Sequence, residues 1–199
     1  MIRNFLFDIG NVLLAFDLTP AVARLNHRQD LTTEQATAHL VSHRDLMEAG
    51  KIPPEVFISR LTHDLAWPGN PGEAAAIYAD IFTPILPNWE LADNLSKRGF
   101  RLVLFSNISP IHSEFINTRY EVFSLFPEAI FSYNTGDIKP RDGMYREAVE
   151  KLGMKPEETF YIDDNPDNIA TGKRFGFHTH LYDAAHHDSL IGALVKAGI

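Results

Sequence analysis

Carboxylates follow two apolar segments that lie far apart in the chain. Asp8 ends the first segment and precedes Gly10 and Asn11, which permit a tight backbone path. Asp163 and Asp164 end another, and adjacent carboxylates repel each other unless a cation lies close to them. Taken singly, each Asp could equally cap a turn or a helix. If these residues are catalytic, the Asp8 carboxylate can attack phosphorus to form an aspartyl-phosphate. The carboxylates of Asp163 and Asp164 are ligands of the kind that Mg²⁺ prefers.

Polar residues that could hold a phosphate group follow a third apolar segment. Ser106 offers a hydroxyl, and Asn107 lies in a strand-to-helix turn whose backbone N–H groups can bind phosphate oxygens. The alternative is that they merely cap the helix that starts near Ser109. Lys139 is a compact cation that suits phosphate, and Pro140 restricts its backbone.

The elements that must position these residues are short, continuous apolar runs. Such runs indicate strands that are covered on both faces, as in a parallel sheet. The expected strands are Ile2–Asp8, Phe100–Ser106, Ala129–Ser132, Thr159–Asp163 and Phe177–Tyr182. Helical patterns lie between them at Pro87–Arg98, Asp142–Leu152 and Asn165–Phe175. This alternation predicts an open, doubly wound α/β sheet, in which ligands bind at the carboxyl ends of the strands.

The segment from Leu18 to Thr83 breaks this rhythm. It contains no convincing strand, and its helical patterns are Leu18–Asn26, Thr33–Leu40, Glu55–Leu65 and Gly72–Phe82. We therefore expect a helical domain of residues 17–84 inserted into a core formed by residues 1–16 and 85–199.

The composition excludes several classes of protein. The chain has 199 residues, a formal net charge of −8 and no cysteine, so disulfides and thiolate metal sites are impossible. No basic run suggests nucleic-acid binding, and no apolar stretch is long enough for a membrane span or a secretory signal. We expect a cytoplasmic monomer or homodimer whose partner is a small phosphorylated metabolite, held by local positive charge from a metal or lysine.

Together these pieces resemble the haloacid dehalogenase (HAD) superfamily. Its four motifs match FDIGNVLL at Phe7–Leu14, LFSN at Leu104–Asn107, DIKP at Asp137–Pro140 and YIDDNPDNI at Tyr161–Ile169. The resemblance implies a Rossmann-like, three-layer α/β/α core with a parallel sheet, and a small α-helical cap domain inserted after the first strand. It implies a Mg²⁺-dependent phosphatase that works through an aspartyl-phosphate intermediate.

The resemblance also implies a role for each matched residue. Asp8 would be the nucleophile and a magnesium ligand, and the Gly10 carbonyl, Asp163 and Asp164 would complete the protein's ligands. The other matched residues would act on the substrate: Ser106 and Asn107 would bind the transferring phosphoryl group, and Lys139 would neutralise Asp8 and the phosphate.

The chain departs from the family at Gly10, where most of its phosphatases carry an Asp that acts as general acid and base. Such catalysis is typically worth ~10²–10⁴ in rate. Either the rate depends steeply on the leaving group, or another residue replaces the acid; the candidates are Asp17, His43, Arg44 and Glu48.

The FDIGNVL variant resembles a branch that includes α-D-glucose 1-phosphate phosphatases, which favours a sugar phosphate as substrate. The alternatives are a dehalogenase, which also lacks that Asp but needs no Mg²⁺, and a catalytically weak binding or regulatory protein.

Overall fold

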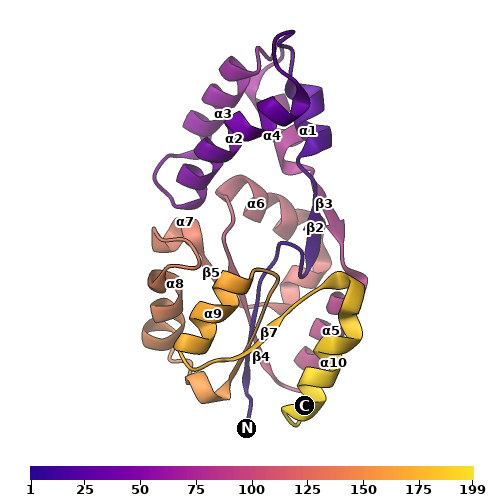
Figure 1. The fold of residues 1–199 in the computed structure, drawn as a ribbon, viewed down its shortest axis with the longest axis vertical. Coiled ribbons are helices and arrows are strands. Elements are labelled where there is room, and N and C mark those ends of the chain that lie inside the picture. The colour runs from indigo at the N-terminus through magenta and orange to yellow at the C-terminus, as the bar shows by residue number, and fades with distance from the viewer.

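The computed structural model describes residues 1–199, except for the side chains of residues 39 and 42. An α/β part carries both chain termini at one end of the molecule, and a group of four helices, α1 to α4, forms the other end (Figure 1). None of the helices in the described part of the chain is long and apolar enough to cross a membrane.

The five expected strands form one parallel sheet in the order β5-β4-β1-β6-β7. Their bounds are β1 (Asn4–Phe7), β4 (Arg101–Ser106), β5 (Glu128–Phe131), β6 (Thr159–Asp163) and β7 (His178–Leu181). β1 lies in the middle, with β4 on one side and β6 on the other, so the strand order reverses beside β1. That reversal is where ligands bind in open α/β sheets.

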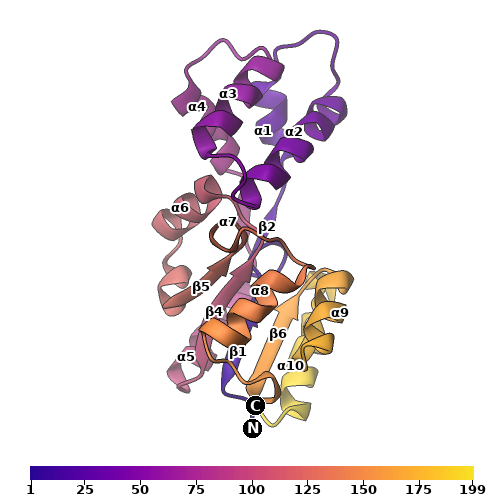
Figure 2. The same cartoon turned by 90° about the vertical axis from the view of Figure 1, so that its left-hand side faces the viewer.

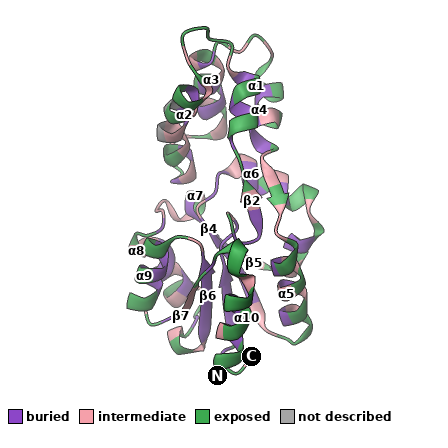
Figure 3. Cartoon of the chain, turned by 45° about the vertical axis from the view of Figure 1, so that its right-hand side comes forward, coloured by how far each residue is buried: buried purple, intermediate pink, exposed green. Residues whose placement is uncertain are grey.

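Side chains of β1 alternate between two hydrophobic clusters, one on each face of the sheet. Phe5 and Phe7 pack in the cluster that includes helices α5, α6 and α10, whereas Leu6 packs in the cluster that includes α8 and α9. Figure 2 shows α8 and α9 against the sheet, and Figure 3 shows the centre of the sheet as buried; the central strands β1, β4 and β6 are buried, whereas the edge strand β7 is partly exposed. Burial on both faces explains why the central strands read as continuous apolar runs, and the expected three-layer α/β/α fold is confirmed.

Helices α5, α6, α8 and α9 agree with the sequence patterns, with one change, whereas α7 and α10 were not predicted. Their bounds are α5 (Leu86–Lys97), α6 (Pro110–Arg119), α7 (Ser132–Thr135), α8 (Asp142–Arg146), α9 (Pro166–Arg174) and α10 (His187–Lys196). The helix expected over Asp142–Leu152 changes after Arg146 into a π-helical segment, η2 (Glu147–Lys151). Short 3₁₀ turns are η1 (Glu121–Leu125), η3 (Pro156–Glu158) and η4 (Ala184–His186).

Helices α1 to α4 have a hydrophobic cluster of their own. They span α1 (Thr19–Leu25), α2 (Thr33–Glu48), α3 (Pro54–Asp64) and α4 (Pro71–Ala79). Val22, Leu40, Phe57 and Tyr78, one from each helix, are buried in this cluster, and Ile111 of α6 packs against it from the core. The start of α2 is fixed by a capping box in which Thr32 and Gln35 exchange hydrogen bonds.

Two short strands that the sequence analysis missed connect the two parts. β2 (Leu14–Phe16) and β3 (Phe82–Pro84) pair antiparallel, with Phe16 opposite Phe82. The expectation of no strand between Leu18 and Thr83 was therefore wrong for the last two residues of that segment, which belong to β3. The helix expected over Gly72–Phe82 stops at Ala79. Each strand has only three residues, too few for an alternating pattern.

Candidate active site

The register of the sheet brings three of the motif residues to one level. Phe7 of β1 is paired with Leu104 of β4 and with Ile162 of β6. Asp8, one residue further along, is consequently level with Phe105 and Asp163 at the carboxyl edge of the sheet. The Asp8 backbone N–H continues this pairing by donating to the Ile162 carbonyl at 3.0 Å.

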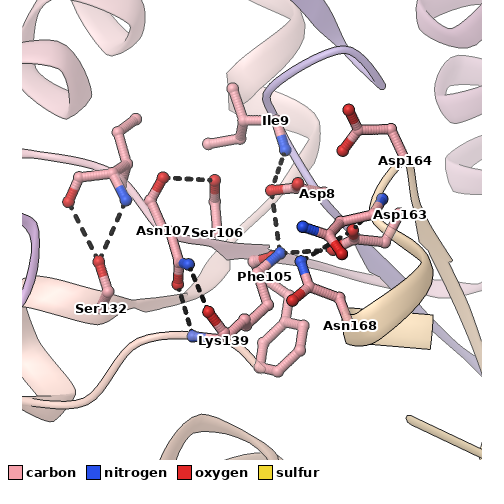
Figure 4. Close-up of polar contacts among 12 residues, drawn as sticks. Asp8, Ile9, Phe105, Ser106, Asn107, Ser132, Lys139, Asp163, Asp164 and Asn168 are labelled. Atoms are coloured by element: carbon pink, nitrogen blue, oxygen red, sulfur yellow. Dashed lines mark hydrogen bonds and ion pairs between the residues drawn. The ribbon is translucent and has the colours of Figure 1, made fainter. Parts of the chain in front are cut away.

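Lys139 lies at the centre of the polar contacts (Figure 4). Its ammonium nitrogen is 3.1 Å from Oδ1 of Asp8 and 2.6 Å from Oδ2 of Asp163, and it donates to the Phe105 carbonyl at 2.7 Å. The side chain is 1% exposed and lies over the rings of Phe105 and Tyr161, with centroids at 5.2 and 5.7 Å. A lysine held in this way supplies a fixed positive charge beside Asp8.

Asp163 is buried, and both oxygens of its carboxylate accept hydrogen bonds. Oδ1 accepts from the Asn165 backbone N–H and from Nδ2 of Asn168, both at 2.9 Å. Oδ2 accepts from Lys139 at 2.6 Å and from the Tyr161 hydroxyl. Since a carboxylate offers about four lone-pair sites, these four donors satisfy it.

Asp164 points away from these contacts and toward the first motif. Its Oδ2 accepts from Nδ2 of Asn11 at 2.9 Å. Asn11 adopts the left-handed backbone conformation, with φ of 51°, which asparagine tolerates. Oxygen atoms of Asp8, Asp163 and Asp164 lie within 4.8 Å of one another, so hard oxygen donors gather at one point. This donor set fits a divalent cation such as Mg²⁺.

The charges at this point are not balanced by the protein alone. Burial, with Asp163 and Asp164 as like charges, raises the pKa of Asp8 to about 7, although Lys139 and Ser106 oppose the rise. Burial likewise raises the pKa of Asp164. Burial would also raise the pKa of Asp163, but Lys139 and the hydrogen bonds hold it below its ordinary value. A further cation would relieve the excess negative charge.

The predicted phosphate-binding residues Ser106 and Asn107 lie beside Asp8 and Lys139 in Figure 4. They do not cap α6, because the Ser109 side chain accepts from the His112 backbone N–H and fills that position. Nδ2 of Asn107 donates to the Lys139 carbonyl at 3.0 Å, and its Oδ1 accepts from the Lys139 N–H at 2.8 Å. The Asn107 side chain therefore holds the lysine loop in place.

A cavity of about 410 Å³ opens above these residues and reaches helix α2. On the core side it is lined by the predicted residues Asp8, Gly10, Ser106, Asn107, Lys139 and Asp164. Of the four candidate acids, Arg44 and Glu48 line it from helix α2. Asp17 is exposed and accepts from the Thr19 N–H at 2.8 Å, and His43 lines a different cavity between α2 and α3.

The sequence analysis missed three residues that shape the site. Tyr161 and Asn168 bind Asp163, and both lie inside the YIDDNPDNI motif, which was the available signal. Phe16 lines the cavity next to Gly10, and nothing in its sequence context distinguishes it from a core residue.

Comparisons with known proteins agree with this geometry. A family model described as haloacid dehalogenase-like hydrolase matches residues 2–176. D-Ribitol-5-phosphate phosphatase of Bacteroides thetaiotaomicron is 24% identical over 188 residues, covering 90% of this chain and 91% of that protein.

Two solved structures share the fold. A HAD family enzyme of B. thetaiotaomicron in complex with magnesium and inorganic phosphate has a TM-score of 0.77 at 21% identity, over 92% of this chain and 96% of that one. The L-2-haloacid dehalogenase of Xanthobacter autotrophicus, with chloropropionic acid covalently bound, has a TM-score of 0.64 at 18% identity, over 90% of this chain and 76% of that one.

Proposed function

Because the chain belongs to the haloacid dehalogenase-like hydrolase family, we propose that it is a magnesium-dependent phosphatase acting on a small phosphorylated metabolite. The observation that carries the proposal is the carboxylate cluster: Asp8 and Asp163 share the buried Lys139, and Asp164 lies within reach of both. A dehalogenase has no use for a cation-binding cluster of this kind, so the cluster favours phosphoryl transfer.

In the proposed reaction, an Asp8 oxygen attacks the phosphorus atom and the bond to the leaving oxygen breaks, which yields an aspartyl-phosphate. Lys139 offsets negative charge on Asp8 and on the phosphoryl oxygens, which is the electrostatic contribution that dominates such transfers. Water then attacks phosphorus, which releases phosphate and restores the Asp8 carboxylate.

We assign the ligands of Mg²⁺ to the Asp8 and Asp164 carboxylates and the Gly10 carbonyl, with Asp163 close by. When bound there, Mg²⁺ would neutralise carboxylate and phosphate charge. Asp163 was expected among the ligands, but the donors on both of its oxygens support a different role, that of holding Lys139 against Asp8.

The phosphoryl oxygens are assigned to the Ser106 hydroxyl and to the backbone N–H of Asn107. The Asn107 side chain is committed to the backbone of Lys139, so its amide is a positioning group. Both residues follow β4, where backbone donors before a helix favour an anion.

For the substrate we propose a sugar phosphate or a related polyol phosphate. The D-ribitol-5-phosphate phosphatase supports a polyhydroxylated leaving group, and the FDIGNVL motif supports α-glucose 1-phosphate as a candidate. The cavity of about 410 Å³ is in the size range of small-molecule sites. We further propose that residues 17–84 form a cap domain over a core of residues 1–16 and 85–199.

Hydrolysis of p-nitrophenyl phosphate, with Mg²⁺ and with EDTA, tests this proposal. We expect activity with Mg²⁺ and none in EDTA after confirmed removal of the metal. Asp8→Asn should remove activity and the phosphoryl adduct seen by mass spectrometry while the circular dichroism spectrum is unchanged. Asp93→Asn, at a partly exposed site on α5, is the matched control and should be fully active. If Asp8→Asn keeps more than about a tenth of kcat, a loss below ~1.4 kcal/mol, Asp8 is not the nucleophile.

A further inference from the structure

The core offers no acid at the position of Gly10. A Cβ atom built on Gly10 would lie 3.1 Å from Cε1 and 3.5 Å from Cδ1 of Phe16. The Phe16 ring therefore covers the direction in which a side chain at residue 10 would extend. An apolar ring cannot give a proton to a departing alkoxide, so the proton has to come from elsewhere in the cavity.

Among the described residues that line the cavity, the carboxyl groups belong to Asp8, Glu48 and Asp164. Asp8 and Asp164 are on the core side, where the proposed function uses them as nucleophile and metal ligands. Glu48 enters from the opposite side, on the last residue of α2. A leaving group expelled by Asp8 departs away from Asp8, which is toward the cap side of the cavity.

Within the described part of the chain, the Glu48 carboxyl makes an ion pair but is not saturated by hydrogen bonds. Its side chain is 16% exposed, and its Oε1 lies 3.6 Å from Nε of Arg44, one helical turn earlier. That distance is an ion pair and too long for a hydrogen bond. Nε of Arg44 and the hydroxyl of Tyr78 are buried without a hydrogen-bond partner among the described residues. Buried polar groups are normally paired, and of these two residues Arg44 lines the cavity, so its Nε is the one that a polar ligand there could pair with.

The groups around Glu48 come from several elements. The nearest charges are Arg44 and Asp45, both on α2. Tyr78 of α4 is fully buried, and the His112 ring of α6 stacks on the Tyr78 ring with centroids 4.4 Å apart. Burial lowers the pKa of His112 to about 4, so this imidazole is neutral. On α7, the Tyr133 hydroxyl contacts Ser113 at 3.1 Å.

These surroundings favour the protonated carboxyl. Burial raises the pKa of Glu48 to about 7, with Asp45 adding to the rise and Arg44 opposing it. Across the cavity lie Lys139 and the Asp8 and Asp164 carboxylates. A general acid works best when it changes protonation near the working pH, and Glu48 of α2 lines the same cavity as the nucleophile Asp8.

We propose that Glu48 is the general acid and base that replaces the Asp missing at Gly10. The inference rests on the proposed phosphatase function. As the bond between phosphorus and the leaving oxygen breaks, its electron pair stays on that oxygen, which takes the proton of the Glu48 carboxyl. The Glu48 carboxylate then takes a proton from water as the water oxygen attacks the aspartyl-phosphate, so Asp8 and Glu48 both return to their starting states. Arg44 is a positioning residue for Glu48.

Glu48→Gln tests the inference through its dependence on the leaving group. With ribitol 5-phosphate or glucose 6-phosphate, whose alcohols are poor leaving groups, kcat should fall ~10²–10⁴-fold. With p-nitrophenyl phosphate, whose phenolate leaves without a proton, phosphoenzyme formation in single-turnover experiments should fall less than about tenfold. Glu48→Asp keeps the carboxyl and should recover part of the activity on the alkyl phosphates. Glu34→Gln, at an exposed position on the same helix, should match the wild type.

The pH profile is an independent readout. Because the proton donor is the acid form, kcat of the wild type on an alkyl phosphate should fall as the pH rises above about 7, and Glu48→Gln should lose this limb. An equal loss in the rate of phosphoenzyme formation with both substrate classes, or a loss with neither, overturns the inference while leaving the phosphatase proposal intact. A wild type that hydrolyses no phosphate ester with Mg²⁺ overturns both.

Discussion

Replacing Lys139 with Met keeps most of the length and apolar volume of the side chain and removes only its ammonium group. The Asp8 and Asp163 carboxylates, 3.1 and 2.6 Å from that nitrogen, then lose their shared counter-charge in a site where the lysine is 1% exposed. Removing one partner of a buried ion pair typically costs ~3–5 kcal/mol, because the remaining charge is left uncompensated. We expect a loss of this size in the free energy of unfolding at pH 7.5.

The pH dependence of this loss has a definite sign. In the wild type the folded pKa of Asp163 is depressed, so its contribution is present above the unfolded pKa and is lost as the pH falls through the folded pKa. In Lys139→Met, the charge that most strongly opposes the effect of burial is gone, so the folded pKa values of Asp8 and Asp163 rise, although the hydrogen bonds from Ser106, Tyr161 and Asn165 remain. The variant therefore loses stability as the pH rises above ~4, by up to ~1.4 kcal/mol per pH unit for each carboxylate that stays protonated.

Urea unfolding followed by circular dichroism, at pH 5 and pH 7.5 in EDTA, measures this effect. Lys97→Met is the matched control, because Nζ of Lys97 is also 2.6 Å from a carboxylate oxygen, that of Asp93, but its side chain is 74% exposed. The control should lose less than ~1 kcal/mol at either pH. A loss below ~1 kcal/mol in Lys139→Met at pH 7.5, or the same loss at both pH values, would refute the electrostatic reasoning.

Two other substitutions probe the support of the site. Gly50→Ala should lower the free energy of unfolding by clearly more than Gly153→Ala. Both glycines have positive φ, but only a Cβ on Gly50 would meet the Tyr133 carbonyl oxygen, at 2.4 Å. Gly153→Ala should lose only the ~1 kcal/mol of left-handed strain, and equal losses in urea unfolding would contradict this reasoning. Asn11→Gly removes the amide bound to Asp164 while tolerating the same backbone, and should weaken Mg²⁺ binding in calorimetry ~10–100-fold; unchanged binding would contradict it.

The parallel sheet could be predicted because its signal is local. Strands β1, β4 and β6 are buried on both faces, so each reads as an unbroken apolar run that ends in a polar residue. The carboxyl ends of such strands meet at one edge by geometry alone, which is why Asp8 and Asp163 could be placed together before the structure. β2 and β3 gave no such signal, because three residues are too few to show a period.

The different roles of the individual site residues could not be predicted, because these roles depend on contacts between segments that are distant in the sequence. Asp163 and Asp164 are adjacent and chemically identical, but one faces Lys139 and the other faces Asn11. Helix α2 was expected to stop at Leu40 and continues to Glu48, since the residues that extend it are mostly polar and lack an apolar period. The position of Glu48 in the cavity follows from that extension and from the packing of the helices.

The pairing of β2 with β3 also bears on how this architecture can diversify. Phe16 and Phe82 are cross-strand partners, so the ends of residues 17–81 lie about one strand spacing apart, ~5 Å. A two-residue hairpin turn spans the same gap. Because the entropic cost of closing a loop grows only slowly with its length, a longer segment between these two strands costs little more to close. A segment of different length or fold inserted between β2 and β3 is therefore expected to leave the register of the parallel sheet unchanged.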